Sequence, residues 1–337
     1  MKKIITFGEI LLRYSTNSGE RISQADQLTL HYGGAEANVG VSLSNFGYDV
    51  NLVSKIPDNS LGDAAERHFR SYGVQTNYVL KGGERLGTYY LETGIGERSA
   101  QVTYDRKHSS LTNLTKNEIN FEKIFQGATL FHVSGITPAL SPSLNEITLL
   151  LLKKAKETGV MTSFDFNYRS KLWSQKEAAE AIKPLLPYVD ICSCGELDAI
   201  HLLGIEKADE SLGKEKKLNY YYDKIQEMYP NISYMSSTFR HVISASVNTL
   251  QGNLYTNGVL YHSKVHRIDP IVDRVGGGDA FAAGIIHGIM DGMPSEQNVS
   301  FATAASALKH TVHGDCNVFS EKEIMAFMEN SSGNIIR

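Results

Sequence analysis

The chain has 337 residues, of which 42% are hydrophobic and 21% charged, a composition that excludes a mainly disordered protein. The 33 Lys and Arg residues nearly balance the 37 Asp and Glu residues, so the net charge of −4 gives no reason to expect nucleic acid or an anionic membrane as a partner. No run of about 18 apolar residues could span a membrane, and no signal peptide is apparent. Three cysteines do not form a disulfide framework, so we expect a cytoplasmic protein.

Strand-like and helical patterns alternate along most of the chain. The strand-like runs occupy residues 4–9, 50–54, 129–134, 160–165 and 189–193. The helical patterns occupy residues 35–46, 61–72, 143–158, 176–186 and 196–203. This alternation indicates βαβ units, so we predict an α/β fold with a three-layer, mostly parallel sheet that helices cover on both faces.

Two segments, residues 11–32 and 85–106, interrupt this alternation. Both are polar and rich in tyrosine, and neither has helical periodicity. The second contains LGTYYLETG and RSAQVTYDR, which are typical of two strands joined by a turn at residues 94–96. We predict a small separate β-sheet, inserted within one domain spanning residues 1–337, that acts as a lid over the carboxyl edge of the main sheet.

The strongest chemical signal is DRVGGGDAFAAG, in which Gly276, Gly277 and Gly278 precede Asp279 and a helix rich in small residues. Glycines before a helix leave backbone N–H groups open to an anion, and preorganised amides of this kind stabilise a transferring phosphoryl group. The neighbouring carboxylate is placed to take a proton from an attacking hydroxyl. Taken alone, the same residues also fit a plain turn with an Asp cap. No Gly-Lys-Ser/Thr follows, and no glycine loop follows the first strand, which disfavours a Walker A loop and a nicotinamide enzyme.

This motif resembles the DTxGAGDxFxxG signature of the ribokinase-like (PfkB) family of carbohydrate kinases, and GGAEANVGVSLSNFG resembles the family's N-terminal glycine element. Both motifs stand in the family's order, about 240 residues apart, so the resemblance covers essentially the whole chain. It implies ATP, Mg²⁺ and phosphoryl transfer to a sugar hydroxyl, with Asp279 as the base. It leaves a requirement for a monovalent cation open. By analogy, it also implies a homo-oligomer formed through the lid.

Narrower features, including VTYDRKHSS and FDFNYRSKLW, are similar to the subgroup of 2-keto-3-deoxygluconate kinases. The substrate-binding residues that this resemblance implies are Gly34, Asn38, Tyr90, Tyr104, Arg106, Asn167, Arg169 and Asp315. A sugar acid presents a carboxylate, which the planar guanidinium groups of Arg106 and Arg169 are suited to hold. The alternatives are a kinase for a neutral ketose such as fructose, and a non-catalytic sugar-binding protein on the same fold.

The sequence departs from the family pattern in three places. The Asn-x-x-Glu element that organises the Mg²⁺ water shell is replaced by Gly-Glu-Leu-Asp, so only Asp198 is left for an indirect role through water. The glycine-rich nucleotide loop is replaced by SSTFRHVISASVNTLQG at residues 236–252. In this segment Arg240 either contacts phosphate or lies in an exposed loop. Arg274 replaces the threonine of the signature, at a position that need not face the ligand.

Overall fold

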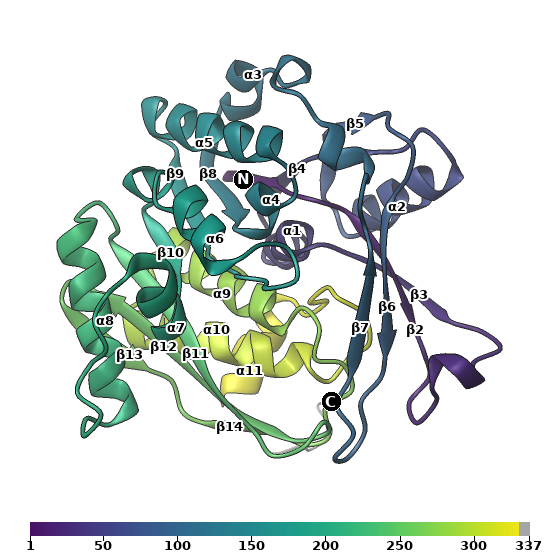
Figure 1. The fold of residues 1–337 in the computed structure, drawn as a ribbon. Coiled ribbons are helices and arrows are strands. Elements are labelled where there is room, and N and C mark those ends of the chain that lie inside the picture. The colour runs from purple at the N-terminus through teal and green to yellow at the C-terminus, as the bar shows by residue number, and fades with distance from the viewer. Residues whose placement is uncertain (330–337) are drawn as a thin grey trace.

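The computed structural model describes residues 1–329, and its centre is a 10-stranded, mostly parallel sheet (Figure 1). Its strands are β1 (Lys3–Phe7), β4 (Asp49–Ile56), β5 (Gln75–Lys81), β8 (Ala128–Ser134), β9 (Met161–Asp165), β10 (Ile191–Ser193), β11 (Tyr234–Val242), β12 (Asn248–Thr256), β13 (Val259–His262) and β14 (His266–Ile268). The order is β13-β12-β11-β10-β9-β8-β1-β4-β5, and β14 pairs with β12. The pairs from β11 through β5 are parallel, whereas β12 pairs antiparallel with its three neighbours.

Helices cover both faces of this sheet. The α-helices are α1 (Ala35–Asn45), α2 (Ser60–Ser71), α3 (Phe121–Phe125), α4 (Ile136–Ala139), α5 (Pro142–Glu157), α6 (Gln175–Ile182), α7 (Glu196–Asp198), α8 (Lys214–Met228), α9 (Gly277–Asp291), α10 (Ser295–Lys309) and α11 (Glu321–Glu329). Shorter turns are the 3₁₀ helices η1 (Ile22–Gln24), η2 (Ser110–Asn113), η3 (Lys116–Glu118) and η4 (Leu186–Tyr188) and the π-helix η5 (Ala199–Leu203). None of the helices within residues 1–329 has both the length and the apolar character needed to cross a bilayer.

Two hydrophobic cores, one on each face of the sheet, confirm the predicted three-layer α/β fold. Along β1, Ile5 and Phe7 belong to the core that contains α5, α6 and α8, whereas Ile4 belongs to the core that contains α1, α2, α9 and α10. Successive side chains of a strand point to opposite faces, so a buried apolar strand supplies both cores.

A second, 4-stranded sheet stands apart from the first, along the right side of Figure 1. Its strands are β2 (Leu11–Ser15), β3 (Thr29–Gly33), β6 (Gly87–Glu92) and β7 (Gln101–Asp105), in the order β3-β2-β6-β7. It is therefore formed from both tyrosine-rich segments, and we call it the lid sheet. The alternation of side chains gives it an inner face, which carries Leu11 and Tyr89, and an outer face, which carries Tyr14 and Tyr90.

The segment at residues 236–252 is a β-hairpin rather than a glycine loop. Strands β11 and β12 pair antiparallel, with Arg240 opposite Leu250 and Val242 opposite Asn248. The turn between them closes through hydrogen bonds from Ile243 N and Ser244 N to Val247 O. Residues 236–242 are therefore held by a regular strand ladder rather than by the backbone turns that a glycine loop makes.

Candidate active site

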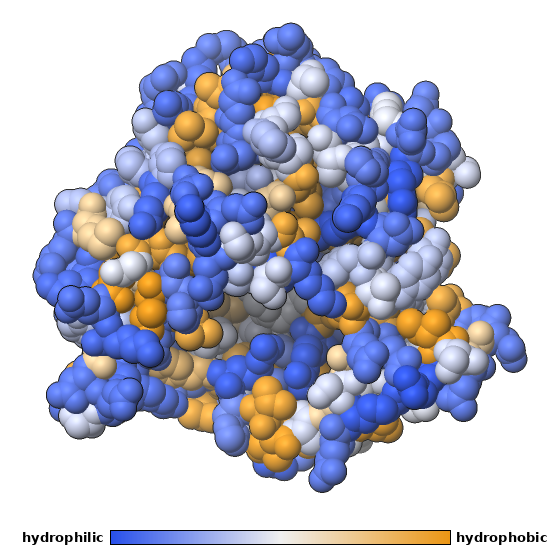
Figure 2. All heavy atoms as spheres, in the orientation of Figure 1, coloured by the Kyte–Doolittle hydropathy of each residue, from blue (hydrophilic) through white to orange (hydrophobic). Residues whose placement is uncertain are grey.

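A cavity of about 620 Å³ lies between the inner face of the lid sheet and the carboxyl edge of the central sheet. Figure 2 shows the surface hollowed near the centre of the view, with hydrophilic residues around the hollow. The structure brings together most of the residues that the sequence singled out, and these line the cavity: Gly34, Asn38, Tyr104, Arg106, Asn167, Arg169, Arg240, Gly276, Gly277, Gly278, Asp279 and Asp315. Two expected residues, Tyr90 and Asp198, do not line it.

The start of α1 is fixed by a buried carboxylate. Glu36 accepts hydrogen bonds from Ser134 N at 2.9 Å and from the Ser134 and Thr137 hydroxyls at 2.7 and 2.8 Å. Gly34 precedes it with φ of 143°, and a Cβ there would lie 2.0 Å from the Glu9 carbonyl oxygen. These contacts tie the helix to the end of β8, and they set the position of Asn38 one turn further along.

The glycine loop leads directly into α9. Gly276 has φ of 80° and caps the helix, and a Cβ there would lie 1.7 Å from the carbonyl oxygen of Asp315. A Cβ at Gly277 would lie 2.4 Å from the ring of His310, so the loop packs against the end of α10. Ala280 N makes a helical bond back to Gly276 O at 2.9 Å, and the N–H groups before it have no place in the helical ladder. The positive end of a 15-residue helix therefore faces the cavity.

Asp279 lies in the first turn of α9 and is half-buried at the cavity wall. Asn38 Nδ2 donates a hydrogen bond to its Oδ2 at 2.7 Å. Burial raises the pKa of Asp279 to about 7, against the opposing effects of the Asn38 bond and the Arg169 charge. A carboxyl group with this pKa accepts a proton near neutral pH, which suits a general base.

Asp165, at the end of β9, is a cavity residue that the sequence reasoning missed. Burial raises its pKa to about 7, and the neighbouring charges of Asp279 and Asp198 contribute to this. Asp198 lies behind the lining, where its Oδ2 accepts a hydrogen bond from Gly195 N at 2.9 Å. The signal for Asp165 was its place at the carboxyl end of a buried strand, because ligands bind outside the carboxyl ends of the strands in open α/β sheets.

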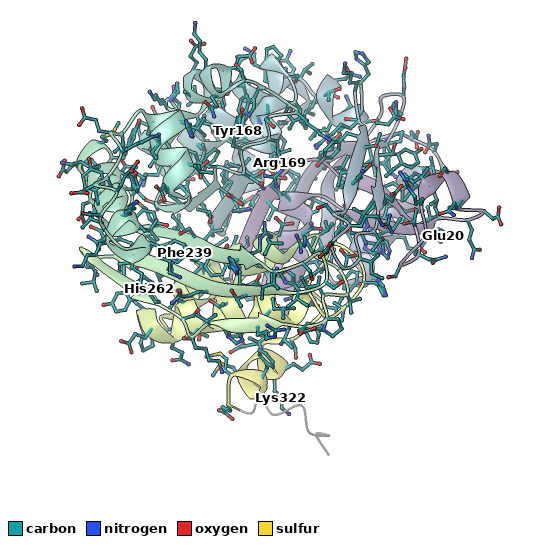
Figure 3. All side chains as sticks on the ribbon, turned by 60° about the horizontal axis from the view of Figure 1, so that its bottom comes forward. Glu20, Tyr168, Arg169, Phe239, His262 and Lys322 are labelled. Carbon is teal, nitrogen blue, oxygen red and sulfur yellow. The ribbon has the colours of Figure 1, made fainter. Side chains whose placement is uncertain are left out.

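Arg169 is exposed and lies in the segment after β9, above the green strands that carry Phe239 in Figure 3. Its NH1 group donates only to backbone carbonyls, those of Asn167 at 3.3 Å and Tyr168 at 3.1 Å. Asn167 has φ of 41°, a left-handed bend that asparagine tolerates, and its N–H donates to Asp165 Oδ1 at 3.2 Å. Among the described residues, no carboxylate forms an ion pair with Arg169, although its charge lowers the pKa values of Asp165 and Asp279.

Arg106 differs from Arg169, because its charge is already paired. Its Nε donates to Glu9 Oε2 at 2.8 Å, and its NH2 group forms a salt bridge with the same oxygen. Both side chains are buried, with relative exposures of 9% and 3%, and Ser109 donates its hydroxyl to the other Glu9 oxygen. Arg106 therefore reaches the cavity as half of a neutral pair.

Tyr89, and not Tyr90, faces the cavity. The Tyr89 hydroxyl donates to Asp315 Oδ2 at 2.5 Å, and its ring lies 5.8 Å from that of Tyr104, its cross-strand neighbour. Tyr90 instead stacks on Tyr14 at 5.1 Å on the outer face of the lid sheet. Adjacent residues of a strand point to opposite faces, so the expectation for Tyr90 is corrected to Tyr89.

The lid sheet is joined to the glycine loop by a buried ionic network. Arg13, which is 1% exposed, lies 2.5 Å from Asp273 and 3.1 Å from Asp315. Asp273 Oδ1 in turn accepts a hydrogen bond from Val275 N at 3.0 Å, just before the loop. The buried guanidinium of Arg13 is thus paired with both carboxylates, which offsets the free-energy cost of removing these charges from water.

Arg240 and Arg274 line the side of the cavity next to the β11–β12 hairpin, together with Gly276–Gly278. Arg240 is on β11 of the hairpin, so it is exposed on a strand rather than in a loop. The sequence left open whether Arg274 faces the ligand site, and in the structure the residue is part of the cavity lining.

A glycine loop at a helix N-terminus, a carboxylate beside it and a small β-sheet over the cavity are typical of one class of protein, the ribokinase-like phosphotransferases that act on an alcohol group. The family model for "pfkB family carbohydrate kinase" matches residues 1–322, so the chain belongs to that family.

Individual relatives agree with this assignment. The chain is 33% identical over 335 residues to a 2-dehydro-3-deoxygalactonokinase of Haloferax volcanii, covering 99% of both chains. It is 42% identical to the solved 2-dehydro-3-deoxygluconokinase of Thermotoga maritima, with a TM-score of 0.94 and coverage of 98% of this chain and 100% of that one. A putative 2-keto-3-deoxygluconate kinase structure from Enterococcus faecalis is 30% identical, with a TM-score of 0.94 and coverage of 100% and 99%.

Proposed function

We propose that this carbohydrate kinase transfers the γ-phosphoryl group of ATP to the terminal hydroxyl of a 2-keto-3-deoxy sugar acid, with 2-keto-3-deoxygluconate as the first candidate. The observation that carries the proposal is Arg169, an exposed guanidinium that lines the cavity near Asp279 and has only backbone carbonyls as partners in the described chain. A free cation at the sugar end suits a carboxylate. The names of the relatives in Haloferax volcanii and Thermotoga maritima point to the same substrate class.

In this proposal, Asp279 takes the proton of the terminal hydroxyl as the oxygen attacks the γ-phosphorus. The backbone amides of Gly276, Gly277 and Gly278 stabilise the charge on the transferred group at the N-terminus of α9. Asn38 fixes the carboxylate of Asp279 through the bond at 2.7 Å, so that one oxygen remains for the substrate. The bond between the γ-phosphorus and the bridging oxygen breaks, and ADP leaves with that oxygen.

The residues present fit an indirectly held Mg²⁺ ion. Asp165 lines the cavity and Asp198 lies behind it. Burial raises the pKa of both, and the charges of Asp279 and Asp198 add to the rise at Asp165. A nearby cation would stabilise the ionised form of such carboxylates. Mg²⁺ keeps several waters in most protein sites, so the contact can be made through water. Within residues 1–329, no group of three or more Asp, Glu, His or Cys residues is arranged so that it could hold a metal ion directly. Bound Mg²⁺ would supply charge neutralisation for the phosphates.

The sugar acid is held, in this proposal, by Gly34, Asn38, Tyr104, Arg106, Asn167, Arg169 and Asp315, and by Tyr89 in place of Tyr90. Only one of the two arginines brings a net charge, because Glu9 neutralises Arg106. We therefore expect one charge-assisted contact to set the preference for the acid, which corresponds to about ten- to hundredfold over a neutral ketose.

Side-by-side phosphorylation of 2-keto-3-deoxygluconate, its galactonate epimer and fructose tests the proposal. Wild type should prefer the acids by about ten- to hundredfold in kcat/KM. Arg169→Ala should remove most of that preference, mainly by weakening the acids, whereas Arg67→Ala on the exposed surface of α2 should leave it unchanged. A wild-type preference for fructose, or an equal loss for all three sugars in Arg169→Ala, would contradict the sugar-acid assignment and favour a ketose kinase.

We also propose that the outer face of the lid sheet pairs with a second copy of the chain in the cytoplasm. Leu30 is 53% exposed on this face, beside the stacked rings of Tyr14 and Tyr90. All three cysteines are free and buried, which accords with a reducing compartment. Light scattering gives the mass in solution, and the kinase assay in K⁺ and in Na⁺ determines whether a monovalent cation is required.

A further inference from the structure

Two departures from the family pattern meet in space. Arg274 replaces the threonine of the signature, and the hairpin at residues 236–252 replaces the glycine-rich loop. In the structure, Arg274 NH2 points to the turn of that hairpin and donates to Ser244 O at 3.4 Å and Ala245 O at 3.3 Å. The turn therefore orients Arg274, while strand β11 of the same hairpin carries Arg240.

The two arginines face the cavity without a counter-charge. No carboxylate of residues 1–329 forms an ion pair with either of them, whereas Arg106, which lines the same cavity, is paired with Glu9. Arg274 is half-buried, and burial together with the charge of Arg240 lowers its pKa. A guanidinium that is partly removed from water beside a second cation is unfavourable unless an anion joins them.

The surroundings indicate which anion would fit. Gly276, Gly277 and Gly278 line the same part of the cavity, and the N-terminus of α9 already favours a phosphate there. A guanidinium group matches two phosphate oxygens with parallel N–H bonds, and two such groups suit an extended polyphosphate better than a single carboxylate. The residues that we assign to the sugar, Tyr104 and Arg106, belong instead to the lid sheet, on strand β7 and directly after it.

We propose that Arg240 and Arg274 together clamp the polyphosphate chain of the nucleotide and replace the glycine-rich loop that this chain lacks. This inference rests on the proposed phosphotransferase function and adds to it the residues that bind the donor. A loop of glycines binds phosphate through backbone amides, whereas this hairpin uses side-chain cations held by strand pairing and by the turn carbonyls.

The test compares wild type with Arg240→Gln, Arg274→Thr, the double variant and the control Arg67→Thr. Steady-state kinetics give KM for ATP and for the sugar acid, and calorimetry gives Kd for ADP and AMP without any sugar. Each single variant should raise the KM for ATP and the Kd for ADP by about ten- to hundredfold, with a smaller effect on AMP. The KM for the sugar acid should change less than about threefold, a range within ordinary context effects. Arg274→Lys, which keeps the charge, should recover part of the ADP affinity.

Thermal melts show whether each variant is folded, and Arg67→Thr should match wild type in every measurement. An ADP affinity within about twofold of wild type in the folded double variant, which is less than about 0.5 kcal/mol, would overturn the clamp. So would a rise in the KM for the sugar acid equal to that for ATP, because the arginines would then serve the sugar end. If wild type phosphorylates no sugar, the proposed function fails, while ADP binding still decides the role of the arginines.

Discussion

Replacing Asp279 by Asn should make the protein more stable and nearly inactive. In the folded chain the pKa of Asp279 is about 7, compared with an ordinary value of 3.8, and burial is the main cause. At a pH between these two pKa values, the carboxyl group of Asp279 has lost its proton in the unfolded chain but keeps it in the folded chain. The free energy of unfolding therefore falls as the pH rises from about 4 to 7. Above pH 7 the folded protein carries a disfavoured negative charge, which the asparagine variant lacks.

The size of the effect follows from the two pKa values. Their full difference corresponds to about 4 kcal/mol. Asp279 borders an open cavity, where solvent screening reduces this to roughly 1–3 kcal/mol. The side-chain carbonyl oxygen of the introduced asparagine can still accept the hydrogen bond that Asn38 donates, so the substitution leaves no orphaned donor.

Urea denaturation at pH 4.5, 6 and 8 measures the free energy of unfolding, and initial rates at pH 8 measure turnover. Asp279→Asn should gain stability at pH 8 and much less at pH 4.5, while turnover falls by about 10²–10⁴. Asp63→Asn is the control, because Lys81 lowers the pKa of Asp63 and its loss should not stabilise the protein. A variant that is no more stable than wild type at pH 8, or that gains equally at both ends of the range, would refute the reasoning.

Two further predictions concern the base and the lid. In wild type, kcat/KM should fall below an apparent pKa near 7. The charge of Asp279 raises the pKa of Asp165, and because such repulsion is reciprocal, Asp165→Asn should move this limb to lower pH. An unmoved limb in a pH–rate profile would argue against repulsion between the two carboxylates. Tyr89→Phe should raise the KM for the sugar about tenfold, because Asp315 loses its hydroxyl donor. Tyr90→Phe on the outer face should leave this KM within about twofold of wild type. Equal effects of the two variants in steady-state kinetics would count against the assignment of the two faces.

The layers of the fold could be predicted from local pattern. The apolar run before Asp165 and the helical spacing after Gly34 each reflect burial against neighbouring elements, which periodicity reports directly. The two polar, tyrosine-rich segments were recognisable as strands for the same reason. Element positions therefore followed from the sequence to within a few residues in most cases.

The errors at the site have a different physical origin. Choosing Tyr89 over Tyr90 requires the register of β6 against β7, because a shift of one residue exchanges the two faces. The pairing of Arg106 with Glu9 spans 97 positions, and the orientation of Arg274 depends on turn carbonyls about 30 positions earlier. Such contacts depend on tertiary packing, and no local spacing in the chain encodes them.

The buried ion pair between Arg13 and Asp273 has a consequence for how the protein is made. The two residues are 260 positions apart, so at roughly 5–20 residues per second the ribosome needs about 13–50 s to supply the partner of a lid residue that emerged first. Until then, burying the guanidinium of Arg13 would cost several kcal/mol, so we expect the inner face of strand β2 to stay hydrated during synthesis. We therefore expect the lid sheet to dock late, and the nascent chain to gain its cavity only after the segment that carries Asp273 has been made.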